Sequence, residues 1–209
     1  MPSIYQLKPA FQQLLRPLVK SLYQWGITAN MVTISAMLLS IAVSLWIYWY
    51  YQQRPAGVFL LLFPLWMLIR MAFNAIDGML AREFNQQSDL GAFYNELCDV
   101  ISDTALYLCL IVFSLIHSYL LLLMVFLAIL SEYAGVMAPM LGQQRRYDGP
   151  MGKSDRAFWL SILCILLVLG HYLNIEPLYL NYLSNSLLLI IILLLLVTIY
   201  NRIRTSLNS

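Results

Sequence analysis

The chain has 209 residues, of which 61% are hydrophobic and only 11% are charged. A water-soluble domain of this size carries about 25% charged residues, so the composition excludes an ordinary soluble protein and predicts that lipid covers much of the surface. The net charge of +2 is too small to indicate a nucleic-acid partner, and we expect none. The three cysteines lie within apolar stretches, which is typical of small core residues and not of a disulfide framework or a metal site.

Residues 4–25 are predicted to form an amphipathic helix that lies in the headgroup layer of the membrane. Apolar side chains recur there at helical spacing, at Phe11, Leu14, Leu15, Leu18, Val19 and Leu22. Pro9 and Pro17 argue against an uninterrupted helix. Two roles stay open for this segment: it could only anchor the first span, or it could also shape the substrate site.

Six stretches are long and apolar enough for a membrane-spanning helix, which needs about 20 residues. They cover residues 31–52, 56–82, 89–117, 118–141, 156–173 and 178–201. The second and third stretches qualify only if their cytoplasmic ends are allowed to carry polar residues. The predicted fold class is an all-α integral membrane protein with six transmembrane helices preceded by the interfacial helix. We expect a single domain over residues 1–209, with the six-helix bundle at residues 31–201.

The distribution of lysine and arginine predicts the orientation in the membrane. With an even number of spans both termini lie on one side, and most basic residues then fall on that side: Lys8, Arg16, Lys20, Arg82, Arg145, Arg146, Lys153, Arg156, Arg202 and Arg204. An excess of lysine and arginine marks the cytoplasmic side. We therefore expect both termini and the functional site to face the cytoplasm, from an inner or cytoplasmic membrane.

Polar residues gather where the second and third spans meet the cytoplasm, although each ionisable residue costs about 3 kcal/mol inside a membrane. Helical spacing gives each span one polar face, formed by Asn74, Asp77 and Ala81 and by Asn95, Asp99 and Ser102. A short polar turn joins the spans, so the two faces can confront each other. Carboxylate and amide oxygens that converge in this way suit Mg²⁺ or Mn²⁺. Gly78 and Gly91 leave room for a bulky ligand, and the Arg82 guanidinium suits a phosphate.

The same run of residues resembles the signature of the CDP-alcohol phosphatidyltransferase family. The pattern reads Asn74-x2-Asp77-Gly78-x2-Ala81-Arg82-x8-Gly91-x3-Asn95-x3-Asp99, and the family has Asp at the two positions that are Asn here. The stretch from Thr28 to Thr33 also resembles the start of the family's first span. The resemblance covers residues 28–160 and implies six transmembrane helices, an interfacial helix before them, and a homodimer.

The resemblance implies metal-dependent transfer of a phosphatidyl-type group from a CDP-alcohol lipid, expected to be CDP-diacylglycerol, to a hydroxyl acceptor, with release of CMP in phospholipid biosynthesis. The implied metal site is Asn74, Asp77, Asn95 and Asp99, and Asp99 is also the candidate general base. The implied substrate-binding set is Thr33, Gly78, Ala81, Arg82, Gly91, Lys153 and Arg156. Within it, the two glycines and Ala81 would border the cytidine, and Arg82 would hold the diphosphate.

Asn74 and Asn95 leave the number of metal ions open. Each Asn keeps an oxygen donor but removes one negative charge, so two divalent ions facing only two carboxylates would be undercompensated. Glu96 and Asp103 could compensate, the site could hold a single ion, or the site could have lost its activity. The alternative function is accordingly a non-catalytic lipid- or partner-binding membrane protein. An ion or proton carrier is disfavoured because the carboxylates gather at one end of the spans.

Two further groups of charges have open roles. Arg70 and Glu132 lie at similar depths in the second and fourth spans, and a buried ion pair between them is favoured over contact with the substrate. The basic loop at residues 145–156 suits positive-inside anchoring. Its residues Lys153 and Arg156 also resemble a family element that contacts a phosphate of the acceptor. The acceptor stays open among glycerol phosphate, inositol phosphate, serine and a second lipid.

Overall fold

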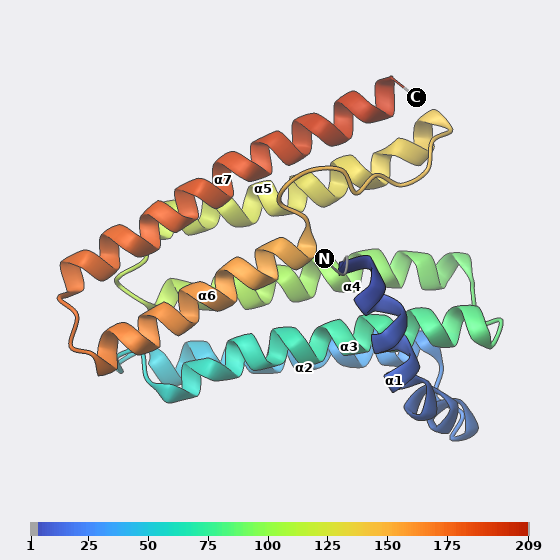
Figure 1. Ribbon diagram of the computed structural model, residues 1–209, viewed down its shortest axis with the longest axis horizontal. Coiled ribbons are helices and arrows are strands. Elements are labelled where there is room, and N and C mark those ends of the chain that lie inside the picture. The colour runs from blue at the N-terminus through green and yellow to red at the C-terminus, as the bar shows by residue number, and fades with distance from the viewer. Residues whose placement is uncertain (1–3, 209) are drawn as a thin grey trace. The chain divides into compact units, whose positions relative to one another are not determined.

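The computed structural model (Figure 1) describes the backbone of residues 4–208 and the side chains of residues 11–208. Within these ranges the chain is helical and contains no strand, as predicted. It forms two compact units, Met1–Ile41 with Leu68–Ser102 and Ala42–Met67 with Asp103–Ser209. The outermost residues of the predicted domain, 1–3 and 209, and the side chain of Lys8 lie outside the described residues.

The first unit is built from α1 and from parts of three longer helices. Its elements are α1 (Ile4–Gln24), the start of α2 (Ala29–Tyr51), the end of α3 (Leu62–Glu83) and the start of α4 (Asp89–Leu108). In Figure 1, α1 crosses the ends of α2 and α3 at a steep angle. It runs without a break through Pro9 and Pro17, which corrects the expectation of an interruption. Packing against neighbouring helices, which supplies most helical stability in proteins, offsets the hydrogen bonds that the prolines remove.

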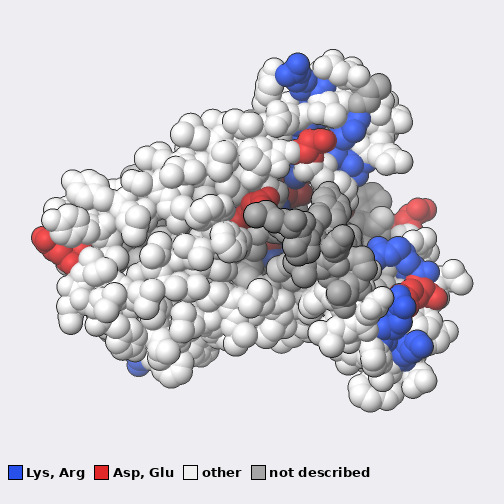
Figure 2. Space-filling model, in the orientation of Figure 1, with Lys and Arg blue, Asp and Glu red and all other residues white. Residues whose placement is uncertain are grey.

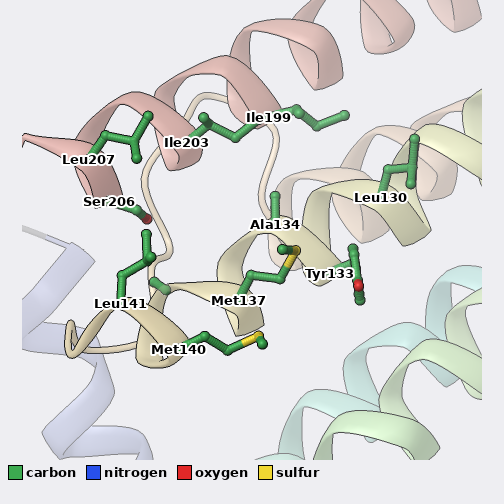
Figure 3. A pocket seen from close by; sticks show the side chains of 11 residues that line it. Leu130, Tyr133, Ala134, Met137, Met140, Leu141, Ile199, Ile203, Ser206 and Leu207 are labelled. Carbon is green, nitrogen blue, oxygen red and sulfur yellow. The ribbon is translucent and has the colours of Figure 1, made fainter.

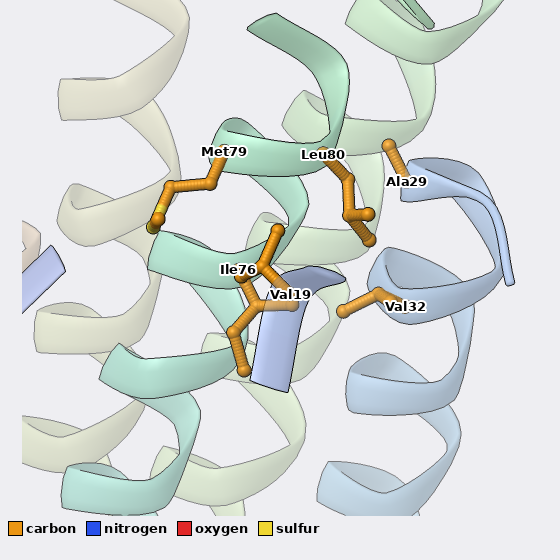
Figure 4. Close-up of a cluster of buried hydrophobic side chains, with 6 residues drawn as sticks. All are labelled: Val19, Ala29, Val32, Ile76, Met79 and Leu80. Atoms are coloured by element: carbon orange, nitrogen blue, oxygen red, sulfur yellow. The ribbon is translucent and has the colours of Figure 1, made fainter. Parts of the chain in front are cut away.

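One side of α1 packs on the unit while another side stays exposed. Val19 is fully buried in a cluster with residues of α2 and α3, namely Ala29, Val32, Ile76, Met79 and Leu80 (Figure 4). Arg16 forms an exposed ion pair with Glu83 at 3.1 Å. Leu14 and Leu18 are exposed, at 75% and 46%. Exposed leucines on an otherwise anchored helix are what a position in the headgroup layer requires, and that position remains a prediction.

Five helical stretches among the described residues are long and apolar enough to cross a membrane: Ala29–Tyr51, Val58–Glu83, Ser118–Leu141, Lys153–Tyr172 and Pro177–Leu207. Most of the face seen in Figure 2 carries uncharged side chains. Together these features make the chain an integral membrane protein. The predicted third span, α4, is not among the five, because its acidic residues Asp89, Glu96, Asp99 and Asp103 lower its hydropathy. The sixth span therefore remains a prediction.

Several helix ends differ from the predicted spans because local geometry decides them. The helix α6 (Lys153–Tyr172) begins before the predicted residue 156, since the N–H of Gly152 donates to the Asp155 carboxylate at 3.0 Å and caps the first turn. The third predicted span does not continue to residue 117 as one helix. It passes from α4 into the short 3₁₀ segment η2 (Cys109–Val112) and then into extended backbone at Phe113.

The second unit contains α5 (Ser118–Met137), the 3₁₀ segments η1 (Val58–Leu61), η2 and η3 (Ala138–Leu141), α6 and α7 (Pro177–Leu207). Buried charges connect its helices. Glu132 lies 2.9 Å from Arg156, 3.2 Å from Arg145 and 3.5 Å from Arg202. The expected partner Arg70 belongs to the first unit, so the ion pair between Arg70 and Glu132 stays a prediction. A carboxylate in an apolar interior needs cationic partners, and Glu132 finds them within its own unit.

An apolar pocket of about 590 Å³ lies in the second unit between the C-terminal parts of α5 and α7 (Figure 3). Its lining includes Met137 and Met140 on one side and Ile203 and Leu207 on the other. Such a lining suits hydrocarbon and offers nothing to a nucleotide. Most of the polar residues predicted for the site, among them Asp77, Arg82 and Asn95, lie in the first unit.

Candidate functional site

A polar pocket of about 350 Å³ lies in the first unit, between α2, α3 and α4. Most of the residues predicted for the site line it: Thr33, Asp77, Gly78, Ala81, Arg82, Gly91 and Asn95. They meet because the chain reverses directly after Glu83. The reversal sets the C-terminal end of α3 against the N-terminal end of α4, as the spacing of the two polar faces predicted.

The Asp77 carboxylate is buried and oriented by a neighbouring helix. The hydroxyl of Thr33 donates a hydrogen bond to Asp77 Oδ2 at 2.8 Å. Thr33 is itself buried on the first turns of α2, and its Oγ1 also lies 3.1 Å from the Ala29 carbonyl oxygen. A hydrogen bond to an ionised carboxylate is about twice as strong as one between neutral groups. Thr33 therefore fixes the position of Asp77 in the pocket wall.

Gly78 makes room for the guanidinium of Arg82. The two residues stand one helical turn apart, and the exposed Arg82 side chain folds back over the glycine. A Cβ atom at Gly78 would lie 3.2 Å from both terminal nitrogens of Arg82. The glycine thus lets a cation lie along the helix backbone at the pocket, where an anionic ligand could reach both terminal nitrogens.

Gly91 allows α4 to start close to α2. A Cβ atom there would lie 2.9 Å from Asn30 Oδ1 and 3.1 Å from Ser88 Oγ. The N–H of Gly91 donates to Ser88 Oγ at 3.0 Å, which caps the start of α4. The turn before it is tied to α2 by the N–H of Ala29, which donates to Gln86 Oε1 at 2.7 Å. These contacts hold the pocket mouth together.

Asp99 and Asn74 do not line this pocket. Asp99 instead pairs with Arg70: the Arg70 Nη2 lies 3.3 Å from Asp99 Oδ1 and 3.1 Å from its backbone carbonyl oxygen. The Arg70 side chain is 4% exposed and that of Asp99 is 24% exposed. Asn74 is half-buried on α3. Within the first unit, Arg70 thus pairs with the candidate general base.

Lys153 and Arg156 belong to the second unit. The Arg156 guanidinium is fully buried, and its Nη atoms donate to Ser131 Oγ, the Met151 carbonyl, Asp103 and Glu132, at 2.9–3.4 Å. Arg156 thus serves a buried ion-pair network. Asp103, one of the two carboxylates that could compensate for the asparagines, pairs with Arg156 at 3.4 Å.

The pocket also contains residues that the sequence reasoning did not single out. They are Ala29, Asn30, Gln86, Gln87, Ser88 and Ala92. Asn30 stands within the stretch from Thr28 to Thr33, and Gln86 to Ser88 form the polar turn between the two motif helices. The sequence therefore contained a run of polar side chains directly beside the motif, but helical spacing alone does not predict that those residues line the pocket.

The donor chemistry of the pocket fits a hard divalent cation. The described residues contain no group of three or more His, Cys, Asp and Glu side chains that could hold a metal ion. The pocket wall instead combines the Asp77 carboxylate with the Asn95 amide and the Thr33 hydroxyl. Oxygen donors of this kind are those that Mg²⁺ and Mn²⁺ prefer, and carbonyl oxygens can take the place of carboxylates.

Comparison with known proteins assigns this chain to a family. The sequence model of the family described as CDP-alcohol phosphatidyltransferase matches residues 26–200. The chain is 46% identical over 155 residues to the inner membrane protein YnbA of Escherichia coli (strain K12), covering 74% of this chain and 75% of that protein.

Solved structures agree on the fold. The crystal structure of Mycobacterium tuberculosis phosphatidylinositol phosphate synthase (PgsA1) with CDP-DAG bound superposes with a TM-score of 0.73 at 20% identity, covering 93% of this chain and 94% of that one. The complex of the same synthase with manganese and citrate gives a TM-score of 0.72 at 20% identity, with 92% and 88% covered. Together with the match over residues 26–200, the chain is a member of the CDP-alcohol phosphatidyltransferases, the membrane transferases of phospholipid biosynthesis.

Proposed function

We propose that this chain transfers a phosphatidyl-type group from CDP-diacylglycerol to a hydroxyl acceptor and releases CMP. The main support is the pocket that collects Thr33, Asp77, Arg82, Gly91 and Asn95 from three helices. Membership of the family supports a CDP-alcohol donor. The mycobacterial synthase with CDP-DAG bound, which has the same fold, supports the diacylglycerol form of that donor.

The proposed setting is the inner membrane, as for the relative YnbA. In this proposal α4 completes six spans, α1 lies in the headgroup layer, and both termini and the pocket face the cytoplasm. Residues 1–209 act as one domain, and two copies assemble as a homodimer. The excess of lysine and arginine near the predicted cytoplasmic ends supports the orientation.

The proposed metal site holds Mg²⁺ or Mn²⁺ through Asn74, Asp77, Asn95 and Asp99, the four positions of the family signature. A divalent ion bound there would neutralise negative charge on the phosphates and on the departing CMP. Thr33 would keep the Asp77 carboxylate in the ligating position through its 2.8 Å hydrogen bond.

In the proposed nucleotide site, small residues let the nucleotide approach the helix backbones closely. Gly78, Ala81 and Gly91 leave the helix backbones accessible to the cytidine, and Arg82 binds the diphosphate with its exposed guanidinium. Lys153 is proposed to contact the acceptor. Arg156 is proposed to act only indirectly, because its guanidinium already serves two carboxylates.

In the proposed reaction, the Asp99 carboxylate accepts the proton of the acceptor hydroxyl. The hydroxyl oxygen then attacks the phosphorus next to the lipid alcohol and forms a new P–O bond. The bond from that phosphorus to the bridging oxygen breaks, and CMP leaves with the electron pair. Arg70 holds Asp99 in place during this step through its contacts at 3.1 and 3.3 Å.

The proposed function is tested by measuring CMP release from CDP-diacylglycerol by the purified full chain. Mg²⁺ and Mn²⁺ are titrated, and glycerol phosphate, inositol phosphate, serine and lipid alcohols are offered in turn. We expect release that depends on both a divalent ion and one acceptor. A protein that binds CDP-diacylglycerol but releases no CMP with any acceptor would instead be the non-catalytic binding protein. The asparagines at positions 74 and 95 would then explain the loss of activity.

Gly91→Ala is expected to raise the KM for CDP-diacylglycerol by about tenfold with a smaller change in kcat, because a change in shared ground- and transition-state binding acts on KM. The added Cβ would stand 2.9 Å from Asn30 Oδ1 and so move the pocket mouth. Gly57→Ala is the matched control, since its Cβ would meet nothing closer than 3.9 Å. An unchanged KM for Gly91→Ala would remove Gly91 from the nucleotide site.

The double variant Asn74→Asp, Asn95→Asp is expected to bind a second divalent ion more tightly than the wild type. Two added carboxylates attract the ion directly, by about 4 kcal/mol for a pair of unit charges 4 Å apart at intermediate dielectric, before desolvation is subtracted. We expect an active wild type and a variant that is slower or altered in its preference between Mg²⁺ and Mn²⁺.

The control for this variant is Asn174→Asp, Asn208→Asp, which adds the same charge at two exposed positions of the second unit. The measurement is CMP release across both metal titrations. A silent wild type beside an active double variant would mean that the natural site has decayed, and the binding-protein function would then be the better one.

A further inference from the structure

Arg70 is a charged side chain inside a predicted membrane span, and the family signature does not include it. It is buried, with 3% of its surface exposed. A charge at such a position costs several kcal/mol unless a partner compensates for it. Its guanidinium contacts Asp99 through both the carboxylate and the backbone carbonyl oxygen. This guanidinium therefore acts directly on one of the four signature positions.

The sequence spacing places this ion pair beside the two asparagines. Arg70 stands one helical turn before Asn74 on α3 and about 10 Å along the helix axis from Asp77. On α4, Asp99 stands one turn after Asn95. The arginine thus lies on the same helix face as the α3 signature residues, on the side of Asn74 that is away from the pocket.

The charge balance at the signature positions depends on this arginine. Four aspartates would match two divalent ions, whereas this chain has only Asp77 and Asp99 at those positions. Arg70 cancels one of the two remaining negative charges. With one divalent ion bound, the net charge of Asp77, Asp99, Arg70 and the ion is +1, and a second ion would raise that net charge to +3. Two further charges stand nearby in the sequence, on half-buried Glu96 and exposed Arg82, and their opposite signs cancel in this count.

We propose that the Arg70 guanidinium is a built-in cation that takes the place of one metal ion, so that this site binds a single Mg²⁺ or Mn²⁺. The two asparagines and the arginine then act together: two signature positions are neutral, and a fixed positive charge stands beside Asp99. The inference rests on the proposed function only in placing a divalent ion at the signature positions. Arg70 acts on that ion through Asp99 and is a positioning residue.

A purely structural role for Arg70, which would only tie α3 to α4, predicts a different behaviour. Loss of the arginine would then lower the stability of the protein but would leave the number of bound ions and their affinity unchanged. A charge-balancing role predicts the opposite change in affinity, because removing a nearby positive charge strengthens the binding of a divalent cation. Counting bound ions therefore separates the two roles without any measurement of turnover.

The experiment is Mn²⁺ binding to the full chain in detergent or nanodiscs, followed by electron paramagnetic resonance of the free ion. The wild type is expected to bind one Mn²⁺. Arg70→Gln, which keeps hydrogen-bond donors but loses the charge, is expected to bind that ion about tenfold more tightly and to admit a second one. Arg70→Lys is expected to behave as the wild type, because it restores the charge. Arg16→Gln is the matched control, since it removes an exposed arginine–carboxylate pair of the same unit.

Two comparable Mn²⁺ ions on the wild type, no bound ion, or an Arg70→Gln protein with unchanged binding would each overturn the proposal. If Arg70→Gln does not fold, as judged by size exclusion, the wild-type count alone decides: one ion supports the proposal and two overturn it. CMP release is measured separately on the same wild-type sample. An active enzyme with two bound ions would refute the role of Arg70 and leave the transferase function intact. An inactive protein with one bound ion would refute the transferase function and leave the role of Arg70 intact.

Discussion

Asp77→Ala is expected to abolish divalent-dependent CMP release and to weaken Mn²⁺ binding below detection. Asp77 is the one carboxylate of the signature that lines the polar pocket. It is buried and held by Thr33 at 2.8 Å, so its negative charge is fixed where the cation would bind. Neither Asn95 nor the Thr33 hydroxyl can replace that charge, because both are neutral donors. The measurement is CMP release and Mn²⁺ binding over the same range of metal concentration.

The control for this variant is Asp89→Ala, which removes an exposed carboxylate at the start of α4 in the same unit. That change is expected to leave CMP release within about twofold of the wild type, since an exposed helix-end charge contributes only about 0.3–1 kcal/mol. Size exclusion and helicity measurements establish that both variants fold. Wild-type activity that persists in a strong chelator would exclude a metal mechanism altogether.

The agreement between sequence and structure is best where helical periodicity alone decides the geometry. The two polar faces were expected to converge because residues three and four apart share a helix face and a short turn reverses the chain. Asn74, Asp99 and Ser102 do not line the pocket, but Asp77, Ala81 and Asn95 do. The structure brings these residues to one pocket with Gly78 and Gly91. Such local rules need no knowledge of the rest of the fold, and this is why the pocket could be predicted from a stretch of chain between residues 74 and 99.

Arg70 shows what periodicity does not determine. Its depth in the second span matched that of Glu132, and depth was the only basis for pairing them. The rotation of each helix about its own axis decides which neighbour a side chain meets, and hydropathy carries little information on that rotation for helices that are apolar on every side. In the structure Glu132 forms ion pairs with Arg145, Arg156 and Arg202, and Arg70 forms one with Asp99.

Helix ends and capping contacts were also beyond the pattern of hydrophobic residues. The start of α6 is capped by a hydrogen bond from the N–H of Gly152 to Asp155. The pocket mouth depends on Gln86, whose side chain accepts a hydrogen bond from the start of α2, 57 residues away in the sequence. A polar turn indicates that such hydrogen bonds can form, but the packing of the helices decides which residue is the partner.

Asp99→Asn is expected to reduce turnover by at least about a hundredfold, because proton transfer to a positioned base contributes roughly 10²–10⁴ to a rate. The amide oxygen can still accept the hydrogen bond from Arg70, so the variant keeps the shape of the site and loses the base. The backbone carbonyl of residue 99 also keeps its contact with Arg70 at 3.1 Å. We therefore expect a folded protein that still binds CDP-diacylglycerol and whose defect lies in kcat.

The matched control is Asp155→Asn, a change of the same kind at an exposed capping residue of the second unit. Its amide oxygen can still accept the bond from Gly152, so turnover is expected to stay near that of the wild type. Single-turnover CMP release, with donor binding measured separately, distinguishes a slow chemical step from weak binding. Near-normal turnover of Asp99→Asn would show that another group takes the proton. Asp99 would then keep only its proposed role as a metal ligand, and the proposed attack of the acceptor hydroxyl would need a different base.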